Sequence, residues 1–300
     1  MLAFPEIHVG EPIAYECLSI FPLIGGPDGN VNYLLSDEAI ASGTVTVEEI
    51  GEAGSVPELA VNNQADELVL FLEGEELRGA KQNRILNTSV LVAARSQTKI
   101  PVSCVEQGRW RYSSRRFGQS GHHATRRMRQ ILKETVQASA MAGMGHHSDQ
   151  IGVWQEVARQ SKSLASSSPT QAMSDTYDAK QASVSDFQTR LKYVEGAVGL
   201  AVAVGDRVVS VDLFDKPSTC RKVWDRLMTG AIMVGLEAKP AEKPVEKSAA
   251  EQLLATLRDS SWEEMPAAGA GKEFRFADGD KHASALVYDG ALVHGSVVTL

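Results

Sequence analysis

Cysteine is scarce in this chain, with only Cys17, Cys104 and Cys220 among 300 residues. The number is odd and no two form a Cys-x-x-Cys pair, which excludes a disulfide framework and a zinc ribbon. Long apolar runs are also lacking, because the longest, Ala197–Val204, has eight residues where a membrane-spanning helix needs about 20. The first residues, Met1–Glu6, have neither the basic start nor the apolar centre of an export signal. These absences predict a cytoplasmic protein with no membrane segment.

Two glycine-rich signatures of nucleotide-binding enzymes are missing as well. The chain has no Gly-x-Gly-x-x-Gly turn and no Gly-x-x-x-x-Gly-Lys-Ser/Thr phosphate loop, so a Rossmann oxidoreductase and a P-loop NTPase are disfavoured. Histidine pairs occur at His122-His123 and His146-His147, but adjacent side chains point in different directions. We therefore expect exposed loop histidines, with a structural role for the lone His294. The sequence predicts no metal site and identifies no cofactor.

Charge is unevenly distributed along the chain. The formal net charge of −8 argues against a general nucleic-acid binder, which carries a basic surplus. Between Gln107 and Lys133, however, there are seven arginines, one lysine and no acid. Two interpretations remain open. The arginines form an anion-binding rim beside an acidic wall, or they lie on a solvated helix face and pair with upstream acids.

Apolar patterning predicts an α+β fold over a single domain, residues 1–300. Residues 1–110 are β-rich, forming a sandwich or barrel-like sheet, with strands expected at Cys17–Ile24, Thr44–Ile50, Glu67–Leu72, Ile85–Ala93 and Lys99–Val105. Residues 111–196 are helical, with helices expected over 128–139, after a capping Ser148, and over 177–194.

The last third, residues 197–300, predicts a hairpin–helix–helix–hairpin arrangement. Val198–Val204 and Arg207–Phe214 flank a Gly-Asp turn, and Ser284–Tyr288 and Ala291–Val298 flank an Asp-Gly turn. One helix is expected from Pro217. After a surface linker at 237–247, a capping box that starts at Ser248 opens the other helix.

Ligand-capable side chains are densest between Glu73 and Trp110. Lys81–Arg84 precede an apolar strand, whose period of two would place Asn83, Asn87 and Ser89 on one face. Burying these polar groups is costly unless they are hydrogen-bonded within the chain or to a ligand. On the next strand, Cys104 and Glu106 share a face, so the carboxylate would raise the thiol pKa unless an arginine intervenes.

Two blocks of this segment resemble a known family. They read Gly74-Glu75-x-Leu-x-Gly79-Ala80-Lys81-Gln82-Asn83-Arg84 and Pro101-Val102-Ser103-Cys104-Val105-Glu106-x-Gly108-Arg109-Trp110. The chain is similar over essentially its whole length to the ADP-ribosylglycohydrolase and rhodanese-phosphatase-associated protein domain family. The resemblance implies work on NAD-derived or ADP-ribosylated molecules in defence or conflict systems. It also implies partnership with an ADP-ribosyl hydrolase or a phosphatase-like protein.

For a small, phosphate-bearing, nucleotide-like ligand, these residues have plausible roles. Arg84 and Arg109 could clamp a pyrophosphate, while Trp110 could stack on an adenine. The expected site comprises catalytic candidates Glu75, Glu106 and Cys104 and ligand-binding candidates Lys81, Gln82, Asn83, Arg84, Asn87, Arg109 and Trp110. A structural alternative stays open, in which Arg84 and Glu75 form a buried pair. The chain is then a hydrolase or transferase on a nucleotide-derived substrate, a non-catalytic nucleotide sensor, or an interaction module.

Overall fold

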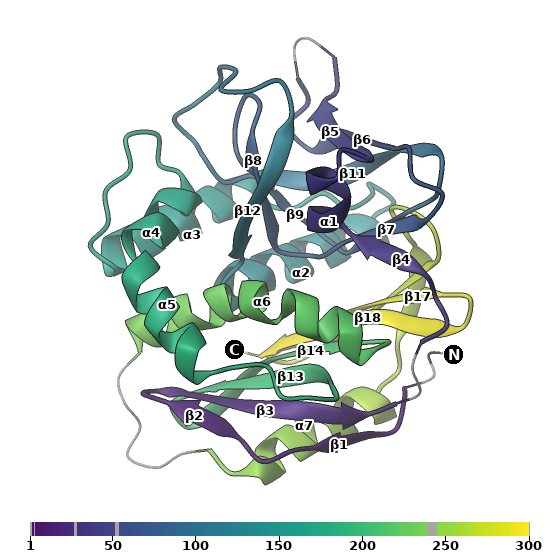
Figure 1. Ribbon diagram of the computed structural model, residues 1–300, viewed down its shortest axis with the longest axis vertical. Helices are drawn as coiled ribbons and strands as arrows, with labels where there is room; N and C mark the ends of the chain where they lie inside the picture. The colour runs from purple at the N-terminus through teal and green to yellow at the C-terminus, as the bar shows by residue number, and fades with distance from the viewer. Residues whose placement is uncertain (1, 3, 27–28, 52–53, 239–244, 300) are drawn as a thin grey trace. The chain divides into compact units, whose positions relative to one another are not determined.

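The computed structural model describes the chain except residues 1, 3, 27–28, 52–53, 239–244 and 300. It is an α+β protein, as the sequence predicts, with 30% of residues in helices and 37% in strands (Figure 1). Backbone contacts divide the described residues into two compact units. Unit 1 contains residues 1–31, 180–265 and 272–300, and unit 2 contains residues 32–179 and 266–271. The expectation of a single domain stays a prediction.

Unit 2 contains two sheets around one apolar core. The six-stranded sheet has the order β12-β8-β9-β11-β6-β5 and the three-stranded sheet has the order β10-β7-β4. Their strands are β4 (Tyr33–Leu35), β5 (Val45–Glu49), β6 (Glu58–Asn63), β7 (Leu68–Phe71), β8 (Glu75–Gly79), β9 (Arg84–Leu86), β10 (Val90–Val92), β11 (Ser96–Cys104) and β12 (Phe117–His123). Phe71 and Val90 of the smaller sheet share a buried cluster with Val61, Val102 and Phe117 of the larger one.

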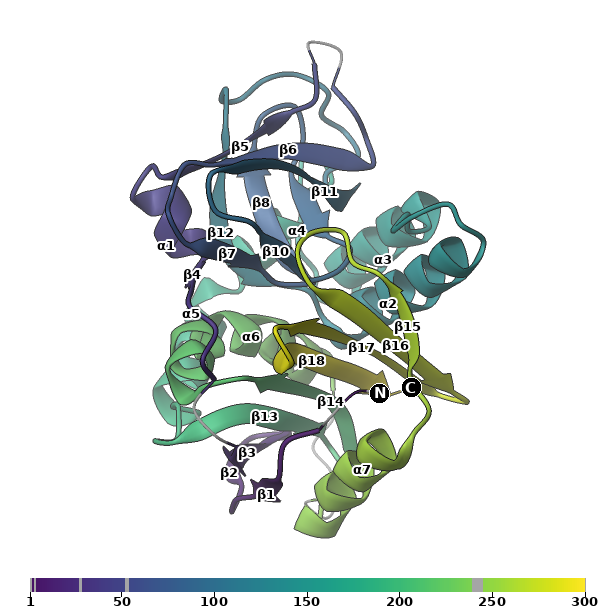
Figure 2. The same cartoon turned by 90° about the vertical axis from the view of Figure 1, so that its right-hand side faces the viewer.

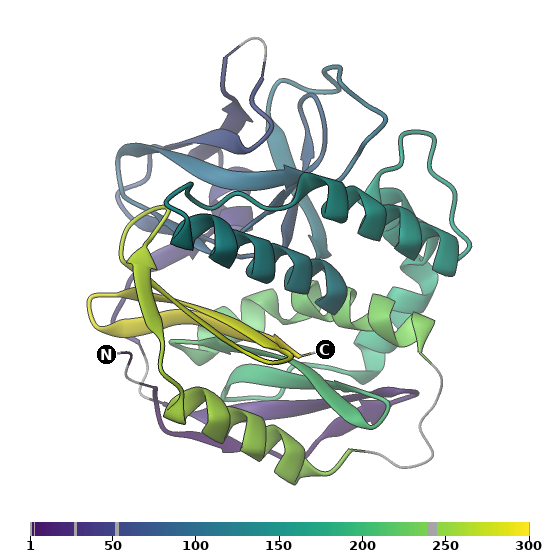
Figure 3. The same ribbon diagram turned by 180° about the vertical axis from the view of Figure 1, so that it is seen from behind.

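The helices of unit 2 are α1 (Ser36–Ala41), α2 (Arg126–Met141), α3 (Gln150–Ser163) and α4 (Met173–Ala179). Figure 3 shows α2 and α3 lying side by side. Helix α2 confirms the periodicity expected over 128–139, and it buries Met128, Leu132 and Val136. The single helix expected over 177–194 is instead two, α4 and α5 (Gln181–Arg190), because the chain leaves helical geometry near Lys180.

Unit 1 is built on an antiparallel sheet with the order β1-β3-β13-β14-β18-β17-β16-β15, and β2 also pairs with β3. Its strands are β1 (Ile7–Val9), β2 (Ile13–Tyr15), β3 (Leu18–Gly25), β13 (Ala197–Val204), β14 (Arg207–Phe214), β15 (Glu263–Pro266), β16 (Lys272–Asp278), β17 (Lys281–Tyr288) and β18 (Ala291–Thr299). Both expected hairpins are present, as β13–β14 and β17–β18.

Two long helices cover opposite faces of this sheet, α6 (Pro217–Glu237) and α7 (Lys247–Asp259) (Figure 2). Leu253 and Leu257 of α7 pack into the apolar cluster on one face, while Gly235 of α6 contacts Leu18 on the other. Pro217 occupies the first turn of α6, as expected. Helix α7 starts one residue before the expected Ser248, and its N-cap makes no side-chain hydrogen bond, so the expected capping box is wrong. Residues 239–244 of the expected linker lie outside the described residues.

The strand expected at Ile85–Ala93 is interrupted, and its two halves belong to different sheets. β9 lies in the six-stranded sheet of unit 2 and β10 in the three-stranded one. Between them, the Asn87 backbone N–H donates to the Pro101 carbonyl at 3.1 Å, and the Ser89 hydroxyl accepts from the Glu73 N–H at 2.9 Å. The expected alternation of side chains between the two faces of the strand therefore ends at Leu86. Beyond it, Asn87 and Ser89 form hydrogen bonds to backbone groups where the chain passes from one sheet to the other.

Candidate functional site

Arg84, the first residue of β9, is fully buried and paired with a carboxylate from another strand. Its Nη2 lies 3.4 Å from both carboxylate oxygens of Glu49 on β5, and its Nη1 donates to Gln82 Oε1 at 3.1 Å. The Glu49 side chain is 1% exposed and also accepts the Lys81 backbone N–H at 3.3 Å. The alternative pairing of Arg84 with Glu75 is wrong. A ligand phosphate cannot reach this guanidinium without opening the site.

Glu106 and Arg109 form a second ion pair, which joins two loops. Arg109 Nη2 and Nε donate to the Glu106 carboxylate at 2.6 and 2.8 Å. The remaining Arg109 donors reach the Ala80 carbonyl at 2.6 Å and Asn83 Oδ1 at 3.1 Å. Glu106 in turn accepts the Asn83 backbone N–H at 3.0 Å and the Thr170 hydroxyl at 2.8 Å. These partners satisfy the groups within the chain, so the pair fixes the loop around Asn83.

The pKa of Glu106 reflects this network. Burial alone would raise the pKa of the carboxyl, but hydrogen bonds from Arg109, Thr170 and the Asn83 N–H outweigh it and hold the pKa below its usual value. Glu106 is therefore ionised at neutral pH and has no proton to donate. A general-acid role would need this network to break.

Cys104, at the end of β11, is buried, and burial is the main cause that raises its pKa to about 11. The neighbouring Arg84 partly offsets this shift and Glu49 adds to it. The expected rise in the thiol pKa is thus present, but Glu106 is not its cause. A protonated, buried thiol is a poor nucleophile, so the environment of Cys104 disfavours covalent catalysis.

Two expected site residues lie in other parts of unit 2. Glu75 opens β8, where its carboxylate accepts the Ser36 hydroxyl at 2.8 Å. Gly79 closes the same strand, about 13 Å further along at the usual rise per residue. Asn87 accepts the Ser103 hydroxyl at 2.6 Å and donates to the His146 carbonyl at 2.9 Å. Glu75 and Asn87 therefore have separate environments from the segment Lys81–Arg84.

The loop of residues 110–116 is exposed throughout and is here called the aromatic–basic loop. The Trp110 and Tyr112 side chains are 47% and 52% exposed. The Lys81 Nζ lies 5.4 Å from the Trp110 ring centroid and 5.2 Å from that of Tyr112, and the Arg84 guanidinium lies 5.6 Å from the Trp110 centroid. These cation–π contacts hold the rings in place while leaving them open to solvent.

Arginines of the aromatic–basic loop differ in their partners. Arg116 Nε donates to Glu48 at 2.9 Å. Within the part of the chain that the structure describes, the side chains of Arg111 and Arg115 have neither an ion-pair nor a hydrogen-bond partner. Pairing with upstream acids is therefore confirmed for part of the run, including Arg116 with Glu48 and Arg129 with Glu73, while the anion-binding rim stays a prediction. The run of charges in the sequence includes Arg111 and Arg115, but the sequence does not show that their side chains are exposed. Tyr112 was not among the expected site residues, because no sequence pattern singled it out.

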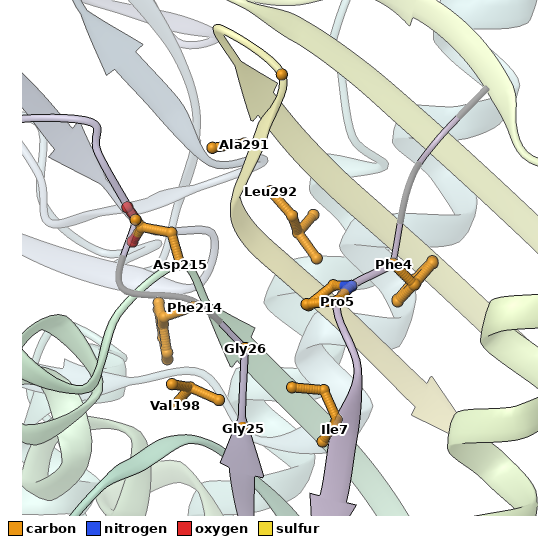
Figure 4. A pocket seen from close by; sticks show the side chains of 12 residues that line it. Phe4, Pro5, Ile7, Gly25, Gly26, Val198, Phe214, Asp215, Ala291 and Leu292 are labelled. Carbon is orange, nitrogen blue, oxygen red and sulfur yellow. The ribbon is translucent and has the colours of Figure 1, made fainter.

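A hollow of about 710 Å³ lies beside this loop. It is lined by Glu48, Glu49, Gly51, Tyr112, Ser114 and Arg115. A smaller hollow of about 210 Å³ lies in unit 1, where Figure 4 shows apolar side chains such as Phe4, Val198 and Leu292 around it, with Asp215 at its edge. Among the described residues, the hollow in unit 1 has no cationic side chain in its lining. The hollow beside the aromatic–basic loop contains Arg115, and its two carboxylates, Glu48 and Glu49, are paired with Arg116 and Arg84, so it is the better anion site.

The histidines at 122 and 123 are buried, which corrects the expectation of exposed loop residues. His122 is 7% exposed, lies 3.0 Å from Glu76 Oε2 through Nδ1, and stacks on Tyr177. In unit 1, His294 Nε2 lies 3.3 Å from Asp212. Among the residues described, no group of three His, Cys, Asp or Glu side chains could hold a metal ion.

Comparison with known proteins gives one match. Among the described residues, no helix is long and apolar enough to cross a membrane. No curated protein and no solved structure matches the chain. A family model, the ARG and Rhodanese-Phosphatase-superfamily-associated Protein domain, matches residues 6–298. That range includes nearly all of both units and both of the blocks on which the resemblance rests, so the chain belongs to this family.

Proposed function

We propose that this chain is a cytoplasmic module that binds an ADP-ribose-like, phosphate-bearing ligand at the aromatic–basic loop. The observation that carries the proposal is that this loop combines two exposed aromatic rings, Trp110 and Tyr112, with Arg111 and Arg115, whose side chains have no partner among the described residues. Tyr112 and Arg115 also line the hollow of about 710 Å³. The family name, which associates these proteins with ADP-ribosylglycohydrolases, supports an ADP-ribose-like ligand.

Each part of such a ligand has a suitable partner in the loop. The faces of Trp110 and Tyr112 suit an adenine, and stacking a base on an aromatic ring contributes about 1–3 kcal/mol. Arg111 and Arg115 can bind the pyrophosphate through paired N–H donors. Lys81 contributes indirectly, because its ammonium holds both rings through cation–π contacts.

Binding is favoured over chemistry by the state of the catalytic candidates. Glu106 is ionised and engaged by Arg109, and burial raises the pKa of Cys104 to about 11. Hydrolysis or group transfer by Glu75, Glu106 or Cys104 is the alternative, and it requires these buried groups to become accessible. A binding module would present its ligand to a partner, for which we propose an ADP-ribosyl hydrolase or a phosphatase-like protein in a defence or conflict system.

Isothermal titration calorimetry and thermal melting test the proposal with ADP-ribose, NAD and an ADP-ribosylated peptide. We expect at least one to bind and to raise the Tm, with roughly tenfold weaker binding by Trp110→Ala or Arg115→Ala. Both side chains are exposed, so folding should be unaffected.

The matched control is Arg95→Ala, which removes an exposed arginine of unit 2 that pairs with Asp66. It should bind the ligand like the parent protein. Unchanged melting with every nucleotide would overturn the proposal. Product formation, followed by mass spectrometry, would instead favour the enzymatic alternative.

A further inference from the structure

The hollow beside the aromatic–basic loop is lined by two glutamates whose environments differ. The Glu49 side chain is 1% exposed, and both of its carboxylate oxygens lie 3.4 Å from Arg84 Nη2. Glu48, the preceding residue of β5, has a side chain that is 36% exposed. Successive side chains of a strand point to opposite faces, so one carboxylate is buried and the other reaches solvent. Of the two, Glu48 is therefore the one accessible to a ligand.

Glu48 uses one of its two carboxylate oxygens within the chain. Its Oε1 accepts the Arg116 Nε–H at 2.9 Å, while its Oε2 accepts no hydrogen bond from any residue that the structure describes. A carboxylate accepts hydrogen bonds at both oxygens and donates none. The contact with Arg116 thus orients the Glu48 carboxylate and leaves it able to accept hydrogen bonds from a ligand.

Arg115 lines the same hollow, and its charge is opposite to that of Glu48. Ser114, the residue before it, is already engaged, because its hydroxyl accepts the Ala80 N–H at 3.0 Å and donates to a loop carbonyl at 2.7 Å. A ligand that fills this hollow must therefore present an anionic group to Arg115 and uncharged hydrogen-bond donors to Glu48.

A ribose next to a phosphate has this combination of groups. Its 2′- and 3′-hydroxyls are adjacent donors, and a carboxylate that accepts from the 2′-hydroxyl also distinguishes NAD from NADP in dinucleotide-binding folds. Tyr112 indicates where the ribose would lie. Its ring is exposed and belongs to the wall of the hollow, so a base stacked on it has its ribose inside the hollow. A 2′-phosphate there would bring a like charge next to Glu48.

We propose that Glu48 is a specificity-determining residue, which accepts hydrogen bonds from the ribose hydroxyls of an adenosine group and rejects a 2′-phosphate. This inference rests on the proposed function and narrows its ligand to nucleotides with a free ribose 2′-hydroxyl. The phosphates lie toward Arg115 and the ribose toward Glu48. The hollow of about 710 Å³ is within the range of about 300–1,000 Å³ that is usual for small-molecule sites.

Isothermal titration calorimetry measures this specificity with ADP-ribose and with its analogues that carry hydrogen or phosphate in place of the adenosine 2′-hydroxyl. We expect the parent protein to bind ADP-ribose at least about tenfold more tightly than either analogue, because one lacks the donor and the other repels the carboxylate. Glu48→Gln should weaken ADP-ribose binding and reduce both differences to about threefold or less, because the charged acceptor is gone.

Glu58→Gln is the matched control. Glu58 lies on the neighbouring strand β6, its side chain is 38% exposed, and it pairs with Lys99 at 3.3 Å, but it does not line the hollow. This variant should bind all three probes like the parent protein. Both glutamates form exposed ion pairs, which contribute little to stability, so thermal melting should show an unchanged Tm for both variants.

The possible failures of this inference and of the proposed function are distinguishable. If the parent protein binds all three probes equally, or if Glu48→Gln binds ADP-ribose like the parent protein, the role of Glu48 is overturned and the proposed function stands. If the parent protein binds none of the probes, both the proposed function and the role of Glu48 are overturned.

Discussion

At the residue scale, the segment Lys81–Arg84 is supported by two buried ion pairs, Arg84–Glu49 and Arg109–Glu106. Removing one partner of a buried pair typically costs about 3–5 kcal/mol, because the remaining charge is left without compensation. The pairs thus make the segment rigid without offering their charges to a ligand. In the proposed function, ligand recognition therefore belongs to the exposed Trp110, Tyr112 and the neighbouring arginines.

Glu106→Gln should lower the free energy of unfolding by about 3 kcal/mol at pH 7, because it leaves Arg109 without its carboxylate. The pKa of Glu106 is lowered in the folded protein, so its contribution is complete above the unfolded value of about 4.3. That contribution is lost as the pH falls through the lower folded pKa. Urea unfolding between pH 7 and pH 3 measures both effects.

The variant's stability curve should consequently be flatter than the parent's below about pH 4.3, with the two curves converging. Arg95→Ala serves as the comparison, since its partner Asp66 is largely exposed and a surface pair contributes at most about 1 kcal/mol. If Glu106→Gln and Arg95→Ala lower the free energy of unfolding equally at pH 7, the Glu106–Arg109 pair does not stabilise the loop around Asn83.

Part of the candidate site could be predicted from sequence. The blocks around Lys81–Arg84 and Glu106–Trp110 do lie together, as their polar clustering indicated. Glu49 could not be found, because it precedes Arg84 by 35 residues and lies on β5, which β11 and β6 separate from β9 in the order of the sheet. Whether an arginine is buried, like Arg84, or exposed, like Arg115, depends on tertiary packing, which a local sequence pattern does not show.

At the element scale, the start of α3 differs from expectation by one residue. The expected cap was Ser148, but the N-cap is Asp149, whose carboxylate accepts the Ile151 N–H at 3.0 Å. Ser148 instead bonds to Ser103. Both residue types cap helices well, so only the tertiary contact decides between them.

Asp149→Ala should therefore lower the free energy of unfolding by about 1 kcal/mol, since the first turn of α3 loses its acceptor. Urea denaturation at pH 7 measures the change. Asp149→Asn keeps an acceptor oxygen and should retain most of the stability. A loss equal to that of the alanine variant would show that the cap bond contributes little.

Strongly periodic elements were predictable, while short ones were not. Helix α2 and both C-terminal hairpins follow their patterns closely. The sequence predicted one strand where the structure has two three-residue strands, β9 and β10, because an apolar run does not show that its two ends pair in different sheets. Helix α1, with six residues, is too short for a periodicity to register.

At the scale of the whole molecule, residues 266–271 return to unit 2 from the far end of the chain. The Ala270 N–H donates to the Leu91 carbonyl at 2.7 Å. A Cβ on Gly269 would lie 2.4 Å from that same carbonyl oxygen and 2.7 Å from Val90 Cγ1. The close approach between this segment and β10 therefore requires a glycine.

Gly269→Ala should lower the free energy of unfolding by about 1–3 kcal/mol, because the backbone must shift to accommodate the methyl group. Gly118→Ala is the matched control. A Cβ there meets nothing within 4 Å, so its stability should stay the same or rise by up to about 1 kcal/mol. Equal urea midpoints for the two variants would contradict the tight contact at Gly269.

The pairing of β3 with β13 has a consequence for synthesis on the ribosome. Phe21 is matched with Ala201, which is made 180 residues later (201 − 21). At roughly 5–20 residues per second, that delay is roughly 10–35 s. For that interval the edge of β3 that later pairs with β13 has no partner strand, and the speed of translation sets how long this edge is exposed to neighbouring nascent chains.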